Sequence, residues 1–431
     1  MAEPVLWPAR RLASRVAILA HRSANAWDPI GTNKWENQTE HTMTYQADQF
    51  GLYLALAVHG GFQVDFLDED AAQNATVMDQ YGVLLITEPN VPKATIKQLS
   101  AWVNGGGTLV VSGGAAVADE YNSTDDTLAS LTGCEMTPFP RRVLPEVRQL
   151  PGPSPLPFAA NGSITSSSGV KKPVTMFGDA SSFAHVKTGS KILGTFDITD
   201  APCAVQSTVG AGSIVQIAWQ PGLSYLINAT QEFYVPNPVT QFPAAIREFL
   251  HEVVLAAAGP PAVSLTESDG TKVVGVETIL LSGPTGAVVT VINWGGVPVS
   301  AALLLTLNLV DAGFGEDAKV GQVLDASTGQ HVAPAKVSPS SITVPVTAVL
   351  ANMIVFPRAG NSRLSVKSDD VDMFRAADQE TQAVSNMMVH QTVPYFGESY
   401  VLIEAEFCHG QLEWWMARDG LEYSISRATV L

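Results

Sequence analysis

Short runs of continuous apolar residues alternate with stretches of helical periodicity in the first part of the chain. Four such runs predict buried strands, at residues 14–20, 62–70, 81–90 and 108–112. Between them, apolar residues recur at helical spacing from Ala47 to Ala57 and from Ile96 to Val103, and glycines end both stretches. Strands that alternate with helices form βαβ units. The sequence therefore predicts a doubly wound, flavodoxin-like α/β domain with a parallel sheet.

The same domain is expected to extend to residue 258. Residues 138–172 are rich in Pro, Gly and Ser and predict an irregular insertion. Four further short strands are expected, at residues 174–177, 191–196, 203–208 and 213–219. A strong helical pattern then covers residues 238–259, and Gly259 with two prolines closes it. The first domain is thus predicted over residues 1–258.

The hydrophobic period changes to two after this helix. Residues 262–357 hold about seven short alternating segments separated by turn residues, which is typical of an antiparallel β-sandwich. We therefore assign residues 259–360 to a second domain. The remaining segment, 361–431, is more charged and less regular, and within it residues 411–428 fit either a helix or a hairpin. Its role is open.

Charge and composition exclude several classes of partner. The formal net charge is -17 at pH 7, which disfavours nucleic acids and anionic membranes. The chain has no apolar run of about 18 residues that could span a membrane, and its start lacks a signal-peptide core. A soluble, cytoplasmic protein is therefore favoured. The three cysteines are far apart and show no metal-binding or disulfide spacing, so neither a metal nor a cofactor is expected.

Two common kinds of site are disfavoured by the order of residues. Gly105, Gly106 and Gly107 precede a strand, whereas glycines that bind phosphate follow one and open a helix. Ser112 lacks the Gly-x-Ser-x-Gly context of a nucleophile elbow. The glycines most simply end a helix and lead into the strand at 108–112.

Acidic and aromatic residues gather after the predicted strands. Because ligands bind beyond the carboxyl ends of parallel strands, these residues are the candidate site. Glu88, Asp119 and Glu120 are the catalytic candidates, since a carboxyl pair can hydrolyse a glycosidic bond. The candidates for ligand contact, by sugar stacking or hydrogen bonding, are Trp27, Asp28, Asn90, Tyr121 and Trp219. Solvated loop carboxylates and buried aromatic rings would give the same pattern.

An ordered set of short pieces resembles a known family. The pieces are Ala55-Leu56, Val64-Asp65-Phe66, Tyr81, Leu99, Trp102-Val103, Gly106-Gly107 and Asp119-Glu120. Over residues 12–258 the chain resembles the trimerisation domain of family 42 β-galactosidases. That domain is similar to a class I glutamine amidotransferase fold without its catalytic cysteine. The following β-sandwich, including residues 289–300, resembles the C-terminal module that accompanies this domain in related bacterial proteins.

The resemblance implies a structural role for this chain and no catalytic activity. In those enzymes a separate catalytic barrel carries two glutamates, and the matching residues here cover only the accessory part. We therefore expect a non-catalytic accessory or oligomerisation protein that forms a trimer and acts beside a glycoside hydrolase. Two alternatives stay open. One is a glycan-binding or weakly hydrolytic protein that uses the acidic and aromatic residues above, and the other is an amidotransferase or peptidase-like hydrolase with a cysteine nucleophile.

Overall fold

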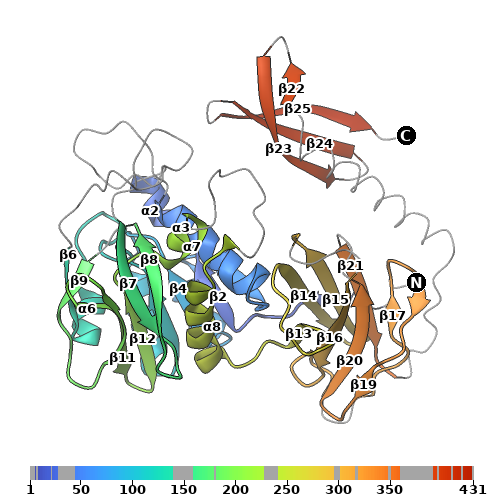
Figure 1. Cartoon of the computed structure of the whole chain (residues 1–431), viewed down its shortest axis with the longest axis horizontal. Coiled ribbons are helices and arrows are strands. Elements are labelled where there is room, and N and C mark those ends of the chain that lie inside the picture. The colour runs from blue at the N-terminus through green and yellow to red at the C-terminus, as the bar shows by residue number, and fades with distance from the viewer. Residues whose placement is uncertain are drawn as a thin grey trace.

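The structure is a computed structural model (Figure 1). It describes residue 5 and residues 8–20, 22–27, 44–138, 159–178, 181–227, 241–295, 301–315, 319–347, 351–359, 392–395, 398–408, 411–418 and 421–429.

A mixed sheet of nine strands forms the centre of the first part, counted over the described residues. Its first five strands are parallel, in the order β3 (Val64–Leu67), β2 (Val16–Leu19), β4 (Val83–Ile86), β5 (Thr108–Val111) and β12 (Gly212–Ile217). Four antiparallel strands continue it, in the order β11 (Pro202–Val209), β10 (Lys191–Phe196), β7 (Ala159–Thr165) and β8 (Lys171–Phe177). The combination of an α/β part with antiparallel sheets is confirmed, but the expected parallel sheet is parallel only as far as β12.

Helices cover both faces of the parallel strands (Figure 1). One face carries α3 (Thr44–Tyr53), its π-helical continuation η1 (Leu54–Val58), α7 (Pro221–Ile227) and α8 (Ala244–Ala258). The other carries η2 (Ala71–Gln73), α4 (Ala75–Met78) and α5 (Lys93–Asn104). Alternation along β2 explains both cores, because Val16 and Ile18 face the first group and Ala17 and Leu19 the second. A strand buried on both faces needs the continuous apolar run that the sequence shows.

Smaller elements surround this sheet. They are α2 (Arg22–Trp27), α6 (Thr127–Thr132), and the pair formed by β6 (Glu135–Pro138) and β9 (Ser181–His185). The predicted irregular insertion at 138–172 is wrong over residues 159–165 and 171–172, because β7 and the start of β8 pair there within the large sheet. Cys134 and Cys203 are buried free thiols.

Two antiparallel sheets face each other in the second part. The first sheet has the order β1 (Arg10–Arg11), β14 (Val276–Gly283), β15 (Gly286–Asn293), β21 (Ala351–Pro357), β17 (Leu324–Asp325) and β18 (Gln330–His331). The second has the order β13 (Val263–Glu267), β16 (Ala302–Asn308), β20 (Ser341–Thr347) and β19 (Lys336–Val337). Leu280 and Val289 of the first sheet pack with Leu305 and Val344 of the second in one core. This is the sandwich that the period of two predicts.

The domain boundary differs from the expected one at the start of the chain. Arg10 pairs with Ser282 and Arg11 with Leu281, so β1 is an edge strand of the sandwich. Val5 also packs with sandwich residues, including Val288 and Val355. The first domain predicted over 1–258 is therefore wrong for these first residues, which belong with the sandwich.

The two parts contact each other directly, side by side in Figure 1. The Tyr53 hydroxyl on α3 donates to a carboxylate oxygen of Glu277 on β14, and Trp294 Nε1 donates to the other one at 3.0 Å. Lys272 Nζ, in the β13–β14 loop, donates to the carbonyl of Gly60 at 2.8 Å. It also lies 2.7 Å from His251 Nε2 of α8. These contacts join α3, α8 and the sandwich.

The end of the chain forms a further antiparallel sheet. Its strands are β22 (Thr392–Tyr395), β23 (Glu398–Cys408), β24 (Gln411–Arg418) and β25 (Leu421–Thr429). The sequence pattern of residues 411–428 fitted either a helix or a hairpin. In the structure, β24 and β25 form a hairpin.

Candidate functional site

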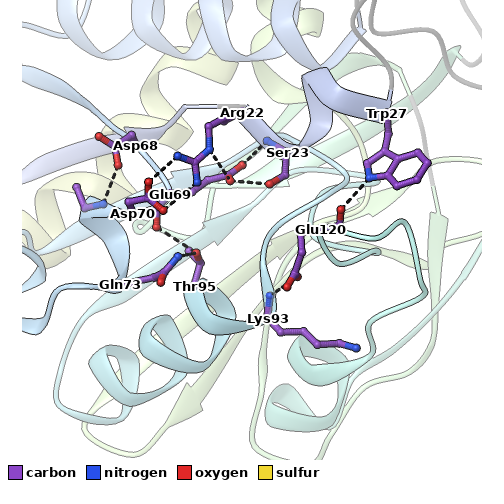
Figure 2. Close-up of polar contacts among 11 residues, drawn as sticks. Arg22, Ser23, Trp27, Asp68, Glu69, Asp70, Gln73, Lys93, Thr95 and Glu120 are labelled. Atoms are coloured by element: carbon purple, nitrogen blue, oxygen red, sulfur yellow. Dashed lines mark hydrogen bonds and ion pairs between the residues drawn. The ribbon is translucent and has the colours of Figure 1, made fainter.

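The predicted site residues lie where the parallel strands end. After β2 the chain enters α2, and after β3 it makes an acidic loop at residues 68–70. Residues 87–92 follow β4, and residues 112–126 follow β5. Because β2, β3, β4 and β5 are parallel neighbours, these four segments meet at one edge of the sheet. Figure 2 shows the polar contacts that they form there.

Glu69 is the buried centre of these contacts. Its carboxylate accepts hydrogen bonds from the backbone N–H and the hydroxyl of Ser23, both at 2.6 Å. Its carbonyl accepts from Thr95 Oγ1 at 3.1 Å, and Gln73 Nε2 donates to the same hydroxyl at 3.2 Å. The carboxylate thus fixes the start of α2, while the carbonyl fixes the start of α5 (Figure 2).

Arg22 closes the outer side of this cluster. Its two terminal nitrogens contact the two carboxylate oxygens of Asp70 at 2.5 and 2.9 Å. This forked geometry is the strongest form of an Arg–carboxylate pair, and it lowers the pKa of Asp70. Both side chains are more than half exposed, so solvent screens the pair. Its main effect is to hold the loop after β3 against α2.

Glu88 is in a very different environment. Its side chain is 0% exposed, and neither carboxylate oxygen has a hydrogen-bond partner among the described residues. Burial, and to a smaller extent the nearby charge of Glu69, raises the pKa of Glu88 to about 8. Glu88 is therefore protonated and neutral at pH 7. A neutral carboxylic acid is a proton donor, but this one has no route to a solvent-borne substrate in the observed conformation.

Asp119 organises the loop after β5. One carboxylate oxygen accepts from the amides of Tyr121 and Ser123 at 2.9 and 2.8 Å. The other lies 2.8 Å from Lys93 Nζ. The lysine and these amides lower the pKa of Asp119. Asn90 adds a second connection, because its side-chain amide donates to the Asp119 carbonyl at 3.1 Å.

Glu120 connects the two exposed aromatic residues to the scaffold. Its carboxylate accepts from the backbone N–H of Lys93 at 2.9 Å, at the start of α5. Its carbonyl accepts from Trp27 Nε1 at 2.9 Å (Figure 2). Trp27 is 51% exposed and Tyr121 is 73% exposed. The indole is thus held by one edge while much of its surface faces solvent.

The structure separates the predicted site residues into three groups. Trp27, Asn90, Asp119, Glu120 and Tyr121 meet in one loop cluster at the sheet edge. Glu88 lies beneath the surface, so it cannot form an accessible carboxyl pair with Asp119 or Glu120. Trp219 lies outside the site, because it is 0% exposed in the core beneath α8. Asp28 lies outside the described residues.

Several residues of this cluster were not predicted as functional. Lys93 contacts Asp119 and Glu120 of this cluster. Arg22, Ser23 and Thr95 contact Asp70 or Glu69 at the same edge of the sheet. Lys93 does carry a signal in the sequence, since a lysine in the first turn of a helix opposes the helix dipole and needs a nearby carboxylate. Asp119 supplies that carboxylate. Ser23 and Thr95 carry no such signal, because small hydroxyl residues occur at many helix starts.

Other candidate sites were also sought in the structure. A cavity of about 290 Å³ lies at the junction of the two parts, lined by residues 12–16, 61–63 and 258–263 together with Thr278, Leu280 and Asp311. It is distant in the fold from the loops at the carboxyl edge. No cluster of three or more His, Cys, Asp or Glu side chains suited to a metal ion occurs in the described part of the chain. The helices in that part are all too short or too polar to cross a membrane.

The solved structures supply the comparison with known proteins. No family model matches the chain, and no curated protein matches it. The β-galactosidase of Bacillus circulans sp. alkalophilus is similar over 80% of this chain, with 12% identity and a TM-score of 0.53. A catalytic mutant of the GH42 β-galactosidase Gan42B from G. stearothermophilus is similar over 80%, with 15% identity and a TM-score of 0.51.

The match covers only part of each of these enzymes. It spans 42% of the B. circulans enzyme and 40% of the G. stearothermophilus enzyme. The chain therefore shares the fold of a portion of family 42 β-galactosidases and spans less than half of their length. At 12–15% identity this likeness concerns the fold alone.

Proposed function

We propose that this chain is a non-catalytic accessory and oligomerisation part of a glycoside hydrolase system, built on a doubly wound amidotransferase-like fold. The observation that carries the proposal is the fold shared with β-galactosidases over 80% of this chain but only about 40% of theirs. The state of the carboxyl groups supports it. Glu88 is buried, and Asp119 is held by Lys93 and two amides, so neither is free to attack or protonate a sugar.

Two measurements on the purified chain test this proposal. Light scattering on a sizing column, over a range of concentrations, should give three times the mass of one chain. A chromogenic galactoside should not be hydrolysed above the rate of a buffer control. A monomer at all concentrations would contradict the oligomerisation role, and turnover that follows the protein through purification would contradict the accessory role.

A second function is favoured by the exposed aromatic pair at the sheet edge. Trp27 donates a hydrogen bond to the carbonyl of Glu120, the residue before Tyr121, and this bond leaves much of the indole ring open to solvent. Aromatic faces beside polar groups suit stacking on sugar rings. We therefore also propose that this edge binds a glycan without cleaving it.

Binding of galacto-oligosaccharides, measured by calorimetry, tests the second function. Trp27→Ala and Tyr121→Ala should each weaken binding at least about tenfold, which corresponds to the loss of one stacking contact of about 1.4 kcal/mol. Val337→Ala is the matched control, because Val337 is 68% exposed on β19 of the sandwich. Equal binding by all three variants and the wild type would exclude this surface as the glycan site.

A further inference from the structure

Three buried side-chain oxygens lie on the sheet face that α3 covers. They are Asp48 Oδ2 on α3, Thr87 Oγ1 after β4 and Ser112 Oγ after β5. Within the described ranges none makes a hydrogen bond of ordinary geometry, although the Asp48 and Ser112 side chains lie close together. The three side chains are 0%, 1% and 1% exposed. A buried polar atom without a partner costs free energy, so such atoms normally mark a bound ion, a water molecule or a functional group.

Strand register brings the two hydroxyls together. Leu85 of β4 pairs with Val110 of β5, and both belong to the core beneath α3. Thr87 and Ser112 each follow two residues later, so they face the same side on adjacent strands. The backbone N–H of Ser112 donates to the Ile86 carbonyl at 3.0 Å, which continues the parallel ladder to this point.

Asp48 lies on α3, which covers these two hydroxyls from the helix side of the sheet. It precedes Leu52 by one helical turn, and Leu52 packs in the same core. Its Oδ1 accepts from the amides of Gly222 and Leu223 at 2.6 and 3.0 Å, at the start of α7. These two bonds fix the carboxylate and leave Oδ2 for the side on which the Thr87 and Ser112 hydroxyls lie.

Asp48 lacks a charged partner. It takes part in none of the ion pairs found among the described residues. A carboxylate that is buried without an ion pair needs a compensating positive charge nearby when it is ionised.

We propose that Asp48, Thr87 and Ser112 bind one monovalent cation between α3 and the ends of β4 and β5. Carboxylate and hydroxyl oxygens are hard ligands of the kind that alkali cations and ammonium accept. One carboxylate balances one positive charge, and the remaining ligands are neutral, which favours a monovalent over a divalent ion. The bound ion would tie α3 and, through the Gly222 and Leu223 amides, α7 to the sheet.

The test is the thermal stability of the full chain at pH 8 in lithium, sodium, potassium, ammonium and choline chlorides. Total ionic strength is kept constant with choline chloride, whose cation is too large for the site. For a dissociation constant of about 1 mM, raising the cation concentration from 1 to 100 mM should raise the midpoint by about 2–3 °C. The same midpoint in all five salts would overturn the proposal.

Two variants separate a specific site from a general salt effect. In Asp48→Asn, the amide oxygen keeps the bonds from Gly222 and Leu223, and the new NH₂ group can donate to the hydroxyls without an ion. This variant should fold and lose the dependence on cation identity. In Ser112→Ala, the dependence should shrink, because one ligand is gone.

Ser207→Ala is the matched control, since it removes a buried hydroxyl on β11, where Ser207 contacts Cys134 and Ser190. It should keep the full cation dependence of the wild type. If Asp48→Asn keeps that dependence, or if Ser207→Ala loses it as Ser112→Ala does, the ion binds elsewhere and the proposal is wrong.

Discussion

Glu88 and Asp119 show how strongly the surroundings of one residue decide its chemistry. Both are carboxyl groups that follow neighbouring strands of the sheet. Burial without partners raises the pKa of Glu88 to about 8, whereas Lys93 and two amides lower the pKa of Asp119. The first is a neutral acid at pH 7, and the second is an anion that holds a loop.

Replacing Glu88 by Gln should flatten the loss of stability between about pH 5 and pH 8. The folded pKa of about 8 lies above the ordinary value, so the folded state keeps a proton that the unfolded state releases above about pH 4. The wild type therefore loses stability as pH rises from about 5 to 8, by up to about 1.4 kcal/mol per pH unit from this group. Glutamine has the same shape and no such proton.

Urea unfolding of both proteins at pH 5, 7 and 9 measures this effect. The advantage of Glu88→Gln should grow with pH. Glu267→Gln, at an exposed position, is the control and should follow the wild type. Parallel pH curves for Glu88→Gln and the wild type would show that Glu88 is ionised in the folded state.

Asp119→Ala should loosen the loop after β5. It removes the acceptor for the Tyr121 and Ser123 amides, which should cost about 1–2 kcal/mol of stability. Lys93→Met removes only the ion pair of a 63% exposed side chain and should cost less than about 1 kcal/mol. Because the pKa of Asp119 is lowered, its contribution is present above about pH 4 and is lost as pH falls through the folded value.

Hydrogen exchange of the two amides, read at pH 7 by mass spectrometry, checks this prediction. Exchange at Tyr121 and Ser123 should accelerate in Asp119→Ala but change little in Lys93→Met. Similar acceleration in the two variants would mean that the lysine, rather than the capping bonds, holds the loop.

At the scale of elements, the closest contact in the first part is the crossing of α3 and α7. A Cβ atom added at Gly222 would lie 1.9 Å from the Asp48 carbonyl oxygen, and one added at Gly51 would lie 2.0 Å from the Gly222 carbonyl oxygen. Only glycine at both positions lets the helices approach this closely. The crossing in turn places Asp48 against the start of α7.

Gly222→Ala should therefore destabilise the fold by about 3 kcal/mol, because the backbone of α3 must move away. Gly105→Ala is the matched control. Gly105 ends α5 with a φ of -78°, and an added Cβ would have its nearest contact at 3.4 Å. Chemical unfolding should place the control within about 0.5 kcal/mol of the wild type. Equal stability of Gly222→Ala would mean that the two helices can separate at little cost.

The sequence predicted elements well where burial alone decides them. β2, β4 and β5 lie within predicted apolar runs, because a strand covered on both faces must be apolar throughout. β7 was missed because its residues are small and polar, and its pairing with β8 and β10 makes it a strand. Trp219 was misplaced for a related reason. Its neighbours in sequence suggest a surface, but the packing of α8 buries it.

The candidate site was predictable in its position but not in its contacts. The alternation of strands and helices correctly located Trp27, Asn90, Asp119, Glu120 and Tyr121 at one edge of the sheet. Which carboxylates are free there depends on side chains from distant segments. Lys93 and Ser23 engage Asp119 and Glu69, and no local pattern specifies these pairs.

At the scale of the whole molecule, Glu277 joins the two parts. It is 6% exposed, and it accepts from Tyr53 on one side and Trp294 on the other. Tyr53→Phe removes one hydrogen-bond donor, so one carboxylate oxygen of the largely buried Glu277 loses its partner. The expected cost is about 1–3 kcal/mol of stability. The expected result is a lower unfolding temperature and weaker coupling between the two parts.

Scanning calorimetry reports both effects. The wild type should unfold in one transition, and Tyr53→Phe should broaden or split it. Tyr121→Phe is the control, since its side chain is 73% exposed and lies at the other edge of the sheet. An unchanged transition in Tyr53→Phe would show that other contacts, such as that of Lys272 with Gly60, suffice to couple the parts.

The pairing of β1 with β14 also bears on the order in which the protein folds during synthesis. Arg10 emerges from the ribosome early, but its partner Ser282 is made only after the entire nine-stranded sheet. At ordinary translation rates the first strand waits on the order of tens of seconds for its neighbour. The α/β part can thus collapse first, while the sandwich closes after it and ties β1 to a segment made much later.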